Sequence, residues 1–175
     1  MKVLVVGQRE VAALLPMAEC MDAMADALRA LARGDVVLPL RQVLTLPAGN
    51  GAFAVMPAVQ DGRAADSAAA VKAITVVPGN HGTAFDSHQG AVLLFEGEHG
   101  SLRAILDASA VTAIRTAAVS GAATRALARE DAGDLAILGT GVQAQTHLEA
   151  MHLARRLRRV RVWSRDAAHV RAFAA

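Results

Sequence analysis

The sequence of 175 residues predicts an α/β fold in two parts, and three observations carry this prediction. Short apolar runs separated by turn signals dominate residues 38–106, as expected of strands. Long helical patterns precede and follow these runs. A strand, a glycine-rich turn, a helix and a second strand then follow in residues 135–163, which is typical of a parallel crossover unit.

The N-terminal elements are a short strand and a long amphipathic helix. Residues 3–6 form an apolar run, residues 10–15 suggest a helical turn, and Pro16 can open the helix that follows. Residues 17–33 carry apolar side chains at helical spacing, and Gly34 is suited to end that helix. The methionine-rich stripe of this helix indicates packing in a core or a dimer rather than a ligand site.

The middle of the chain changes to a strand-like pattern. Its apolar runs cover residues 38–46, 52–57, 69–77, 91–96 and 102–106. The turn signals between them are rich in glycine, asparagine and aspartate. The turn at residues 97–100 lies between two of these runs, which predicts a hairpin.

An alanine-rich helix over residues 110–129 comes next. Asp107 and Ser109 are candidates to cap its N-terminus, and its small side chains allow close approach to other helices. The helix ends at residues 130–133, where we place a domain boundary. The two predicted domains are residues 1–130 and residues 131–175.

The strongest motif follows a short apolar strand. The segment Gly139-Thr140-Gly141-Val142-Gln143-Ala144 matches the pattern G-x-G-x-x-G/A and opens a helix. Gly139 permits a tight turn, Gly141 lets the backbone approach a pyrophosphate, and Ala144 allows the helix to pack closely on the strand. The helix N-terminus supplies N–H groups for phosphates. In this context the motif predicts a Rossmann-type dinucleotide site, with an ordinary glycine-rich turn as the alternative.

The end of the second strand bears on the choice between NADP(H) and NAD(H). An acidic residue at this point holds the ribose in NAD-binding sites. Here Ser164 stands at that position and Arg165 follows, and a hydroxyl beside a guanidinium suits a 2′-phosphate. The sequence therefore favours NADP(H). Asp166 would take the acidic role if the strand ran further, and Arg165 could instead belong to the solvated basic face expected of the arginines at 155–159.

Three cations lie among apolar neighbours. Lys72 interrupts an apolar run, which is costly for a buried strand unless the lysine is paired or lines a cleft. A lysine at a strand edge that reaches water is the alternative. Arg41 and Arg115 are candidates to bind a carboxylate with two hydrogen bonds each. Internal ion pairs with Asp107 or Asp86 are the alternative for these arginines.

Composition excludes several classes of function. Hydrophobic residues make up 54% of the chain, which excludes a disordered tail, and aromatic residues make up 3%, which argues against base stacking as the main activity. Cys20 is the lone cysteine, so there is no intramolecular disulfide and no cysteine-based zinc cluster. We predict no metal site, because His81 and His88 lack the spacing of a metal or nucleophile motif.

Charge and apolar run length limit the partners and the location. A net charge of +2 is too small to argue for nucleic acid, although the late arginines leave nucleic-acid binding as a further alternative. The apolar runs are too short for a signal peptide or a membrane span. We therefore expect a cytoplasmic protein without membrane or nucleic-acid partners.

Several segments occur together in the order found in one known family. They are residues 71–80, residues 87–96, Asp107 with residues 112–118, and the loop that begins at Gly139. With these segments the chain resembles the ornithine cyclodeaminase/mu-crystallin family from about residue 38 to its C-terminus. The resemblance implies two domains: an α/β domain that binds substrate and forms the dimer, and a Rossmann domain that holds NAD(P)(H). Members cyclodeaminate ornithine, deaminate alanine reversibly or reduce ketimines.

The resemblance also implies residue roles. Arg41, Lys72 and Arg115 would hold the substrate α-carboxylate, Lys72 would be the catalytic residue for proton transfer, and Ser87 would line the same pocket. The residues implied for the cofactor are Thr116, Gly139, Thr140, Gly141, Val142, Gln143, Ser164 and Arg165. We expect a small amino or imino acid as substrate and a homodimer as the assembly.

The resemblance leaves several activities open. We favour ketimine reduction, because residues 87–89 and the missing ribose acid look more like the crystallin-type reductases. Ornithine cyclodeaminase and alanine dehydrogenase activities are the alternatives. Chains of the family continue past residue 175 and carry a catalytic aspartate in that part, so we expect a truncated member. A non-catalytic, ligand-binding dimer module is therefore the alternative from another class.

Overall fold

The computed structural model describes residues 2–62 and 67–175, without the side chain of Ala48, and it divides into two compact units. Unit 1 comprises residues 1–14 and 28–111, and unit 2 comprises residues 15–27 and 112–175. Each unit is described by itself below. The predicted functional boundary at residue 130 stays a prediction.

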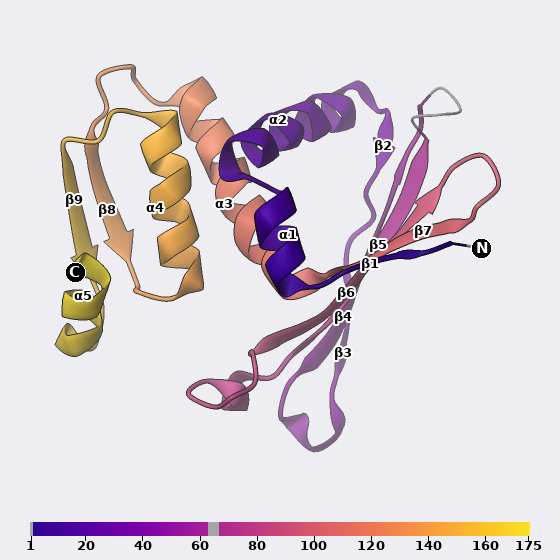
Figure 1. Cartoon of the computed structure of the whole chain (residues 1–175), viewed down its shortest axis with the longest axis horizontal. Helices are drawn as coiled ribbons and strands as arrows, with labels where there is room; N and C mark the ends of the chain where they lie inside the picture. Colours follow the sequence, from indigo (N-terminus) through magenta and orange to yellow (C-terminus); the bar gives the residue numbers. More distant parts are fainter. Residues whose placement is uncertain (1, 63–66) are drawn as a thin grey trace. The chain divides into compact units, whose positions relative to one another are not determined.

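Unit 1 is built on one large sheet with the strand order β1-β7-β6-β5-β4-β2, to which β3 adds by pairing with β4 (Figure 1). Its strands are β1 (Leu4–Val6), β2 (Val36–Val37), β3 (Gln42–Thr45), β4 (Ala52–Gln60), β5 (Ala68–Val76), β6 (His88–Glu96) and β7 (Leu102–Asp107). Neighbouring strands from β4 to β7 run antiparallel, and β1 pairs with β7 in parallel. Helix α1 (Gln8–Leu14) and the 3-10 turns η1 (Pro47–Gly49) and η2 (Pro78–Asn80) complete the unit.

Two prolines explain where the strands depart from the predicted runs. The run at 38–46 contains Pro39 and yields only β3, while the short β2 lies before the run. Pro57 was expected near a strand end, yet β4 continues through it to Gln60. At Pro57 the strand lies between its segments paired with β3 and with β2, so proline interrupts no ladder on that side.

The predicted hairpin at residues 97–100 is confirmed between β6 and β7. The Glu96 carboxylate accepts backbone N–H groups of Glu98 at 2.8 Å, His99 at 3.1 Å and Ser101 at 2.9 Å. The hydrogen bonds from Ser101 and then His99 are the largest causes that lower the pKa of Glu96 to about 2. The charged form of the Glu96 carboxylate therefore stabilises the turn.

The core of unit 1 lies where the central strands meet the start of α3 (Ala108–Leu127). Ala54, Ile74 and Ala108 are buried together, and apolar side chains from the neighbouring strands pack against them. Gly90 lies opposite Ile74 with φ +155°, and a Cβ there would lie 2.1 Å from the Ala73 carbonyl oxygen. Glycine is thus required for this close approach of β6 to β5.

Unit 2 packs three helices through small side chains. They are the first turns of α2 (Met17–Arg33), the greater part of α3, and α4 (Val142–Ala154). The buried cluster consists of Met17, Cys20, Met21, Ala117, Ala118, Ala150 and Ala154. Helix α2 has the predicted bounds, and its end is a Schellman motif in which Gly34, at φ +84°, donates to Leu31 and Asp35 donates to Ala30.

The remainder of unit 2 is the predicted crossover unit. Strands β8 (Asp134–Leu138) and β9 (Arg159–Trp163) pair in parallel, α4 connects them, and α5 (Ala167–Ala174) follows β9. Figure 1 shows α4 lying along this two-stranded sheet. Within the described part of the chain, no helix is both long and apolar enough to cross a membrane.

Candidate active site

The glycine-rich turn joins the end of β8 to the start of α4. Gly139 has φ +116°, a conformation in which glycine is unstrained and other residues are not. Its N–H donates to the carbonyl of Trp163 at 2.7 Å, so the turn is tied to the end of β9. The tight turn predicted for Gly139 is therefore present in the backbone.

The space in front of the turn is open. Gly141 is the N-cap of α4 and supplies no side-chain hydrogen bond; the Ala144 N–H donates to the Gly141 carbonyl at 2.9 Å, while the N–H groups before it face the end of the helix, where a ligand or water can accept them. A Cβ added at Gly139 or Gly141 would meet no heavy atom within 4 Å. Ala144 is 8% exposed, as expected of the small residue that packs at the strand. Thr140 is half-buried and Val142 is exposed at the same turn.

The end of β9 places Ser164 directly after the last strand residue, Trp163. Ser164 is half-buried and Arg165 is exposed. The Asp166 carboxylate accepts the N–H of Ala168 at 2.7 Å as the N-cap of α5. Since the strand does not run on to Asp166, this carboxylate belongs to the helix cap, and Ser164 and Arg165 lie between the end of β9 and that cap.

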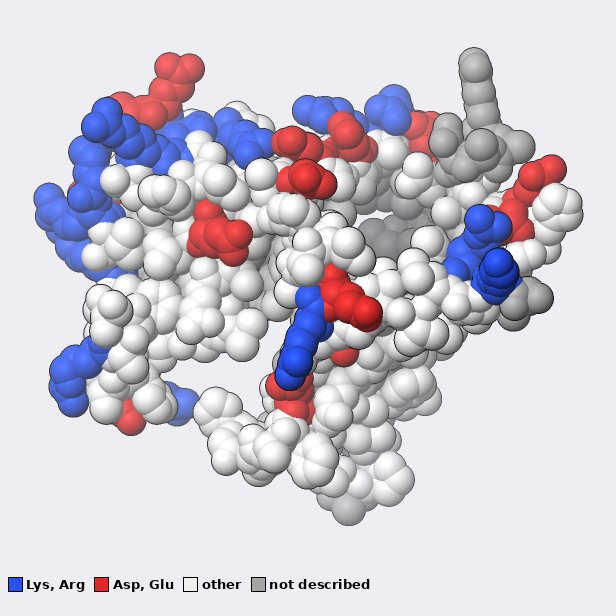
Figure 2. All heavy atoms as spheres, in the orientation of Figure 1, with Lys and Arg blue, Asp and Glu red and all other residues white. Residues whose placement is uncertain are grey.

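The late arginines differ in part from the expected solvated face. Figure 2 shows basic side chains gathered over β8, β9 and the C-terminal end of α4. Arg155, however, donates to the carbonyls of Arg125, Ala128 and Arg129 at 2.7 to 3.1 Å. It therefore caps the end of α3, and Arg158 similarly donates to the Asp131 carbonyl at 2.9 Å.

Lys72 and Arg41 lie in unit 1, across the same part of the sheet. Lys72 is a half-buried residue at the centre of β5, where it pairs with Met56 of β4 and with Val92 of β6. Residues two apart share a face of a strand, so Lys72 lies on the face of Ile74 and of the apolar cluster. Arg41 precedes Gln42, the partner of Val55, and so lies at the level of Met56.

Met56 thus separates the two cations along one row of the sheet. Neighbouring strands lie about 4.8 Å apart, which places the two backbones about 10 Å apart. Long basic side chains can converge over that distance on one small anion.

The Ser87 hydroxyl lies 3.2 Å from His88 Nδ1, and the Ser87 carbonyl accepts the N–H of Val77 at 2.8 Å.

Arg115 and Thr116 lie in the part of α3 that belongs to unit 2. Burial raises the pKa of the Cys20 thiol, and the charge of Arg115 opposes this shift. The Thr116 hydroxyl donates to the Thr112 carbonyl at 2.6 Å. Arg41 and Lys72 thus belong to unit 1, whereas Arg115, Thr116 and the Gly139 turn belong to unit 2.

Two further residues of unit 2 were missed by the sequence interpretation. The Ser120 hydroxyl lies 3.0 Å from His147 Nε2, between α3 and α4. Ser120 is four residues after Thr116, and His147 is four residues after Gln143. That shared helical spacing from two expected cofactor residues is the signal that could have found them.

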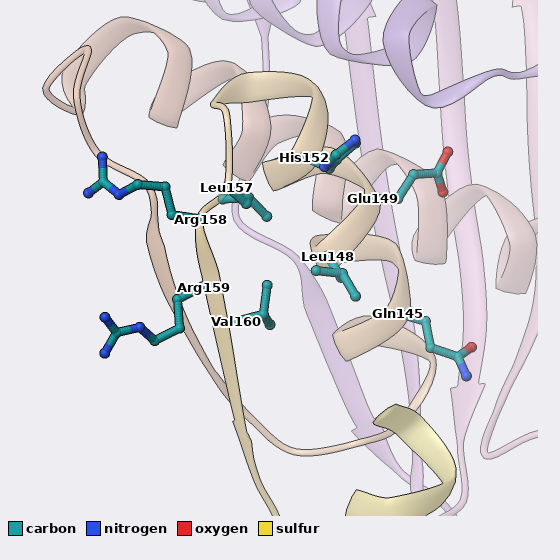
Figure 3. A pocket seen from close by; sticks show the side chains of 8 residues that line it. All are labelled: Gln145, Leu148, Glu149, His152, Leu157, Arg158, Arg159 and Val160. Carbon is teal, nitrogen blue, oxygen red and sulfur yellow. The ribbon is translucent and has the colours of Figure 1, made fainter. Parts of the chain in front are cut away.

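A cavity of about 560 Å³ lies between α4 and the start of β9 (Figure 3). Leu148, Leu157 and Val160 point into it, whereas Arg158 and Arg159 extend away from α4. The cavity is at the opposite end of β9 from Ser164. It is therefore separate from the glycine-rich turn.

The parallel pair of strands and the open glycine-rich turn at a helix N-terminus are typical of the first strand–helix–strand unit of a Rossmann-type fold. The model of the ornithine cyclodeaminase/mu-crystallin family matches residues 1–175, and the chain belongs to this family.

Similar proteins give this membership more detail. The chain is 40% identical over 141 residues to ketimine reductase mu-crystallin of Mus musculus, covering 81% of this chain and 44% of that protein. It is similar to the structure of Thermococcus litoralis Δ1-pyrroline-2-carboxylate reductase in complex with NADH and L-proline. The TM-score there is 0.90 at 30% identity, covering 98% of this chain and 52% of the other.

An archaeal alanine dehydrogenase dimer with bound NAD gives a TM-score of 0.90 at 29% identity, covering 99% of this chain and 52% of the other. The chain thus spans about half the length of these relatives. The expected fold class and family are confirmed.

Proposed function

We propose that the protein is an NAD(P)H-dependent oxidoreductase that acts on the C–N bond of a small amino or imino acid, as a ketimine reductase does. The open Gly139–Ala144 turn at the N-terminus of α4 carries this proposal. The row of Arg41, Met56 and Lys72 supports a site for a carboxylate. The names of the similar proteins support the reaction class.

In the proposed reaction, Arg41, Lys72 and Arg115 bind the α-carboxylate, and Ser87 lines the same pocket. Bound NAD(P)H supplies the hydride that reduces the carbon of the C=N bond. Lys72 gives a proton to the nitrogen, and the product is the amino acid.

The cofactor is held, in this proposal, by backbone groups and side chains of unit 2. These are Thr116, Gly139, Thr140, Gly141, Val142, Gln143, Ser164 and Arg165. The use of Asp166 as a helix cap supports NADP(H) over NAD(H), because it leaves a hydroxyl and a guanidinium at the ribose end. Residues 1–130 form the proposed substrate and dimerisation domain and residues 131–175 the start of the cofactor domain, in a cytoplasmic homodimer.

The test is a titration of the full-length gene product with NADPH and, separately, with NADH, followed by Trp163 fluorescence. Trp163 is suited as the reporter because its carbonyl binds the Gly139 N–H. Tighter binding of NADPH supports the proposal, and tighter binding of NADH overturns the NADP(H) preference. Absence of binding of both overturns the proposed function.

Turnover distinguishes the related activities. A ketimine reductase consumes NADPH with a cyclic imino acid, whereas an ornithine cyclodeaminase releases ammonia from ornithine with no net change in the cofactor. An alanine dehydrogenase reduces its cofactor with alanine. Binding of cofactor and imino acid without any of these reactions would instead support a non-catalytic binding protein.

A further inference from the structure

The contact between α3 and α4 contains a chain of polar groups that ends on one proposed cofactor residue, Gln143, and begins one helical turn from another, Thr116. The Ser120 hydroxyl lies 3.3 Å from the Thr116 carbonyl and 3.0 Å from His147 Nε2. His147 Nδ1 lies 2.7 Å from the Gln143 carbonyl. The Ser120 hydroxyl has one proton to donate, so the chain of hydrogen bonds runs from Ser120 through His147 to Gln143, and Ser120 lies one helical turn after Thr116.

The hydrogen bonds of this chain have a defined direction. A carbonyl only accepts, so His147 Nδ1 carries the proton that is donated to Gln143. In the neutral ring, Nε2 is then an acceptor, and the Ser120 hydroxyl donates to it. The shorter of the two Ser120 distances is the one to His147, in agreement with this direction.

We propose that Ser120 and His147 are positioning residues of the cofactor site. Their bridge fixes the Thr116 turn of α3 relative to the first turn of α4, where Gln143 and the phosphate-facing N–H groups lie. The buried side chains that α3 and α4 contribute to this contact are alanines, which pack closely and make no directional contact of their own. A directional hydrogen bond supplies the register between the two helices.

This inference rests on the proposed binding of NADPH by Thr116 and Gln143. It goes further, because it assigns a role to two residues outside the proposed cofactor and substrate sets. The expected consequence is that loss of the Ser120–His147 bridge raises the dissociation constant for NADPH while it changes the melting temperature little.

The α3–α4 contact offers a matched control one helical turn away. The Thr124 hydroxyl donates to Met151 Sδ at 3.3 Å, and Thr124 and Met151 are each four residues beyond Ser120 and His147. Thr124→Val therefore removes one hydrogen bond from the same helix pair, farther from the cofactor turn.

The experiment measures the NADPH dissociation constant and the melting temperature of the full-length gene product and its variants. We expect Ser120→Ala and His147→Phe each to raise the Kd about three- to tenfold, the range expected for one lost hydrogen bond. Thr124→Val should leave the Kd within about twofold of that of the unaltered protein. Ser120→Thr keeps the hydroxyl and should bind NADPH as tightly as the unaltered protein does. The double variant of Ser120 and His147 should bind like the single variants, because both remove the same bridge.

The outcomes separate the two proposals. If the unaltered protein binds NADPH and Ser120→Ala weakens binding no more than Thr124→Val does, the positioning role is wrong while the proposed function stands. If Ser120→Thr binds NADPH more weakly than the unaltered protein although the two melting temperatures are equal, the positioning role is likewise overturned. If the unaltered protein binds neither NADPH nor NADH, both proposals fall together.

Discussion

Replacement of Gly141 by alanine should separate cofactor binding from stability. Gly141 has φ −83° and ψ −173°, which alanine also adopts, and a Cβ there would meet no atom within 4 Å. Loss of glycine freedom in the unfolded chain stabilises by about 0.4–1 kcal/mol. Alanine at an N-cap costs roughly 0.5–1 kcal/mol. The two effects offset each other, so the free energy of unfolding should change by less than about 1 kcal/mol.

The binding effect should be larger. If the pyrophosphate lies against the Gly141 backbone, a methyl group there occupies its position, and we expect the Kd for NADPH to rise at least about tenfold, or about 1.4 kcal/mol. Trp163 fluorescence measures the Kd, and thermal unfolding measures stability, where about 1 kcal/mol shifts the melting temperature by about 2–4 °C.

Gly139→Ala is the matched comparison. Gly139 has φ +116° with open space around a Cβ, so alanine there meets backbone strain without a clash. Such strain costs about 1–3 kcal/mol of stability. An unchanged Kd in a stable Gly141→Ala protein would refute the placement of the pyrophosphate at this turn. Equal losses of stability in both variants would refute the argument that the backbone conformation requires glycine at position 139 but not at position 141.

Three further predictions concern the fold. Gly90→Ala should lower the free energy of unfolding in urea by more than about 2 kcal/mol, because its Cβ would lie 2.1 Å from the Ala73 carbonyl oxygen; a neutral result would contradict the close β5–β6 approach. Met21→Ala should cost about 2–5 kcal/mol in the same assay, since Met21 is 0% exposed, and a cost below 1 kcal/mol would argue against this core. The pKa of Glu96 is lowered from 4.5 to about 2, so its contribution is complete above pH 4.5 and is lost as the pH falls towards 2. Glu96→Gln should lower the free energy of unfolding at pH 7 and should reduce its dependence on pH between 2 and 4.5. An unchanged dependence on pH would exclude the Glu96 carboxylate as the cause.

Local patterns predicted much of the fold. The amphipathic helix 17–33 has the observed bounds because its stripe and its glycine cap agree, and the Gly139 turn follows from a motif whose glycine is required by its φ. Strand limits near Pro39 and Pro57 were less accurate, because they depend on which neighbouring strand is present at each position.

Contacts between distant segments could not be predicted in the same way. Arg155 was expected on a solvated face, yet its partners at the end of α3 lie 26 to 30 residues earlier in the chain. The Ser120–His147 bridge spans 27 residues. Arg41 and Lys72 share a row only through the register of β3, β4 and β5, which a single sequence does not specify.

The tight three-helix contact of unit 2 has a consequence for how this sequence can drift. A Cβ at Gly121 would lie 2.8 Å from Met21 Cε and 3.2 Å from Ala150 Cβ, so growth at position 121 needs the Met21 side chain to move or to be replaced by a smaller one. Ala117 and Ala118, at 0% exposure, face the same limit. Substitutions at positions 21 and 121 should therefore arise as compensating pairs in diverging copies of this gene, and each alone should be rare.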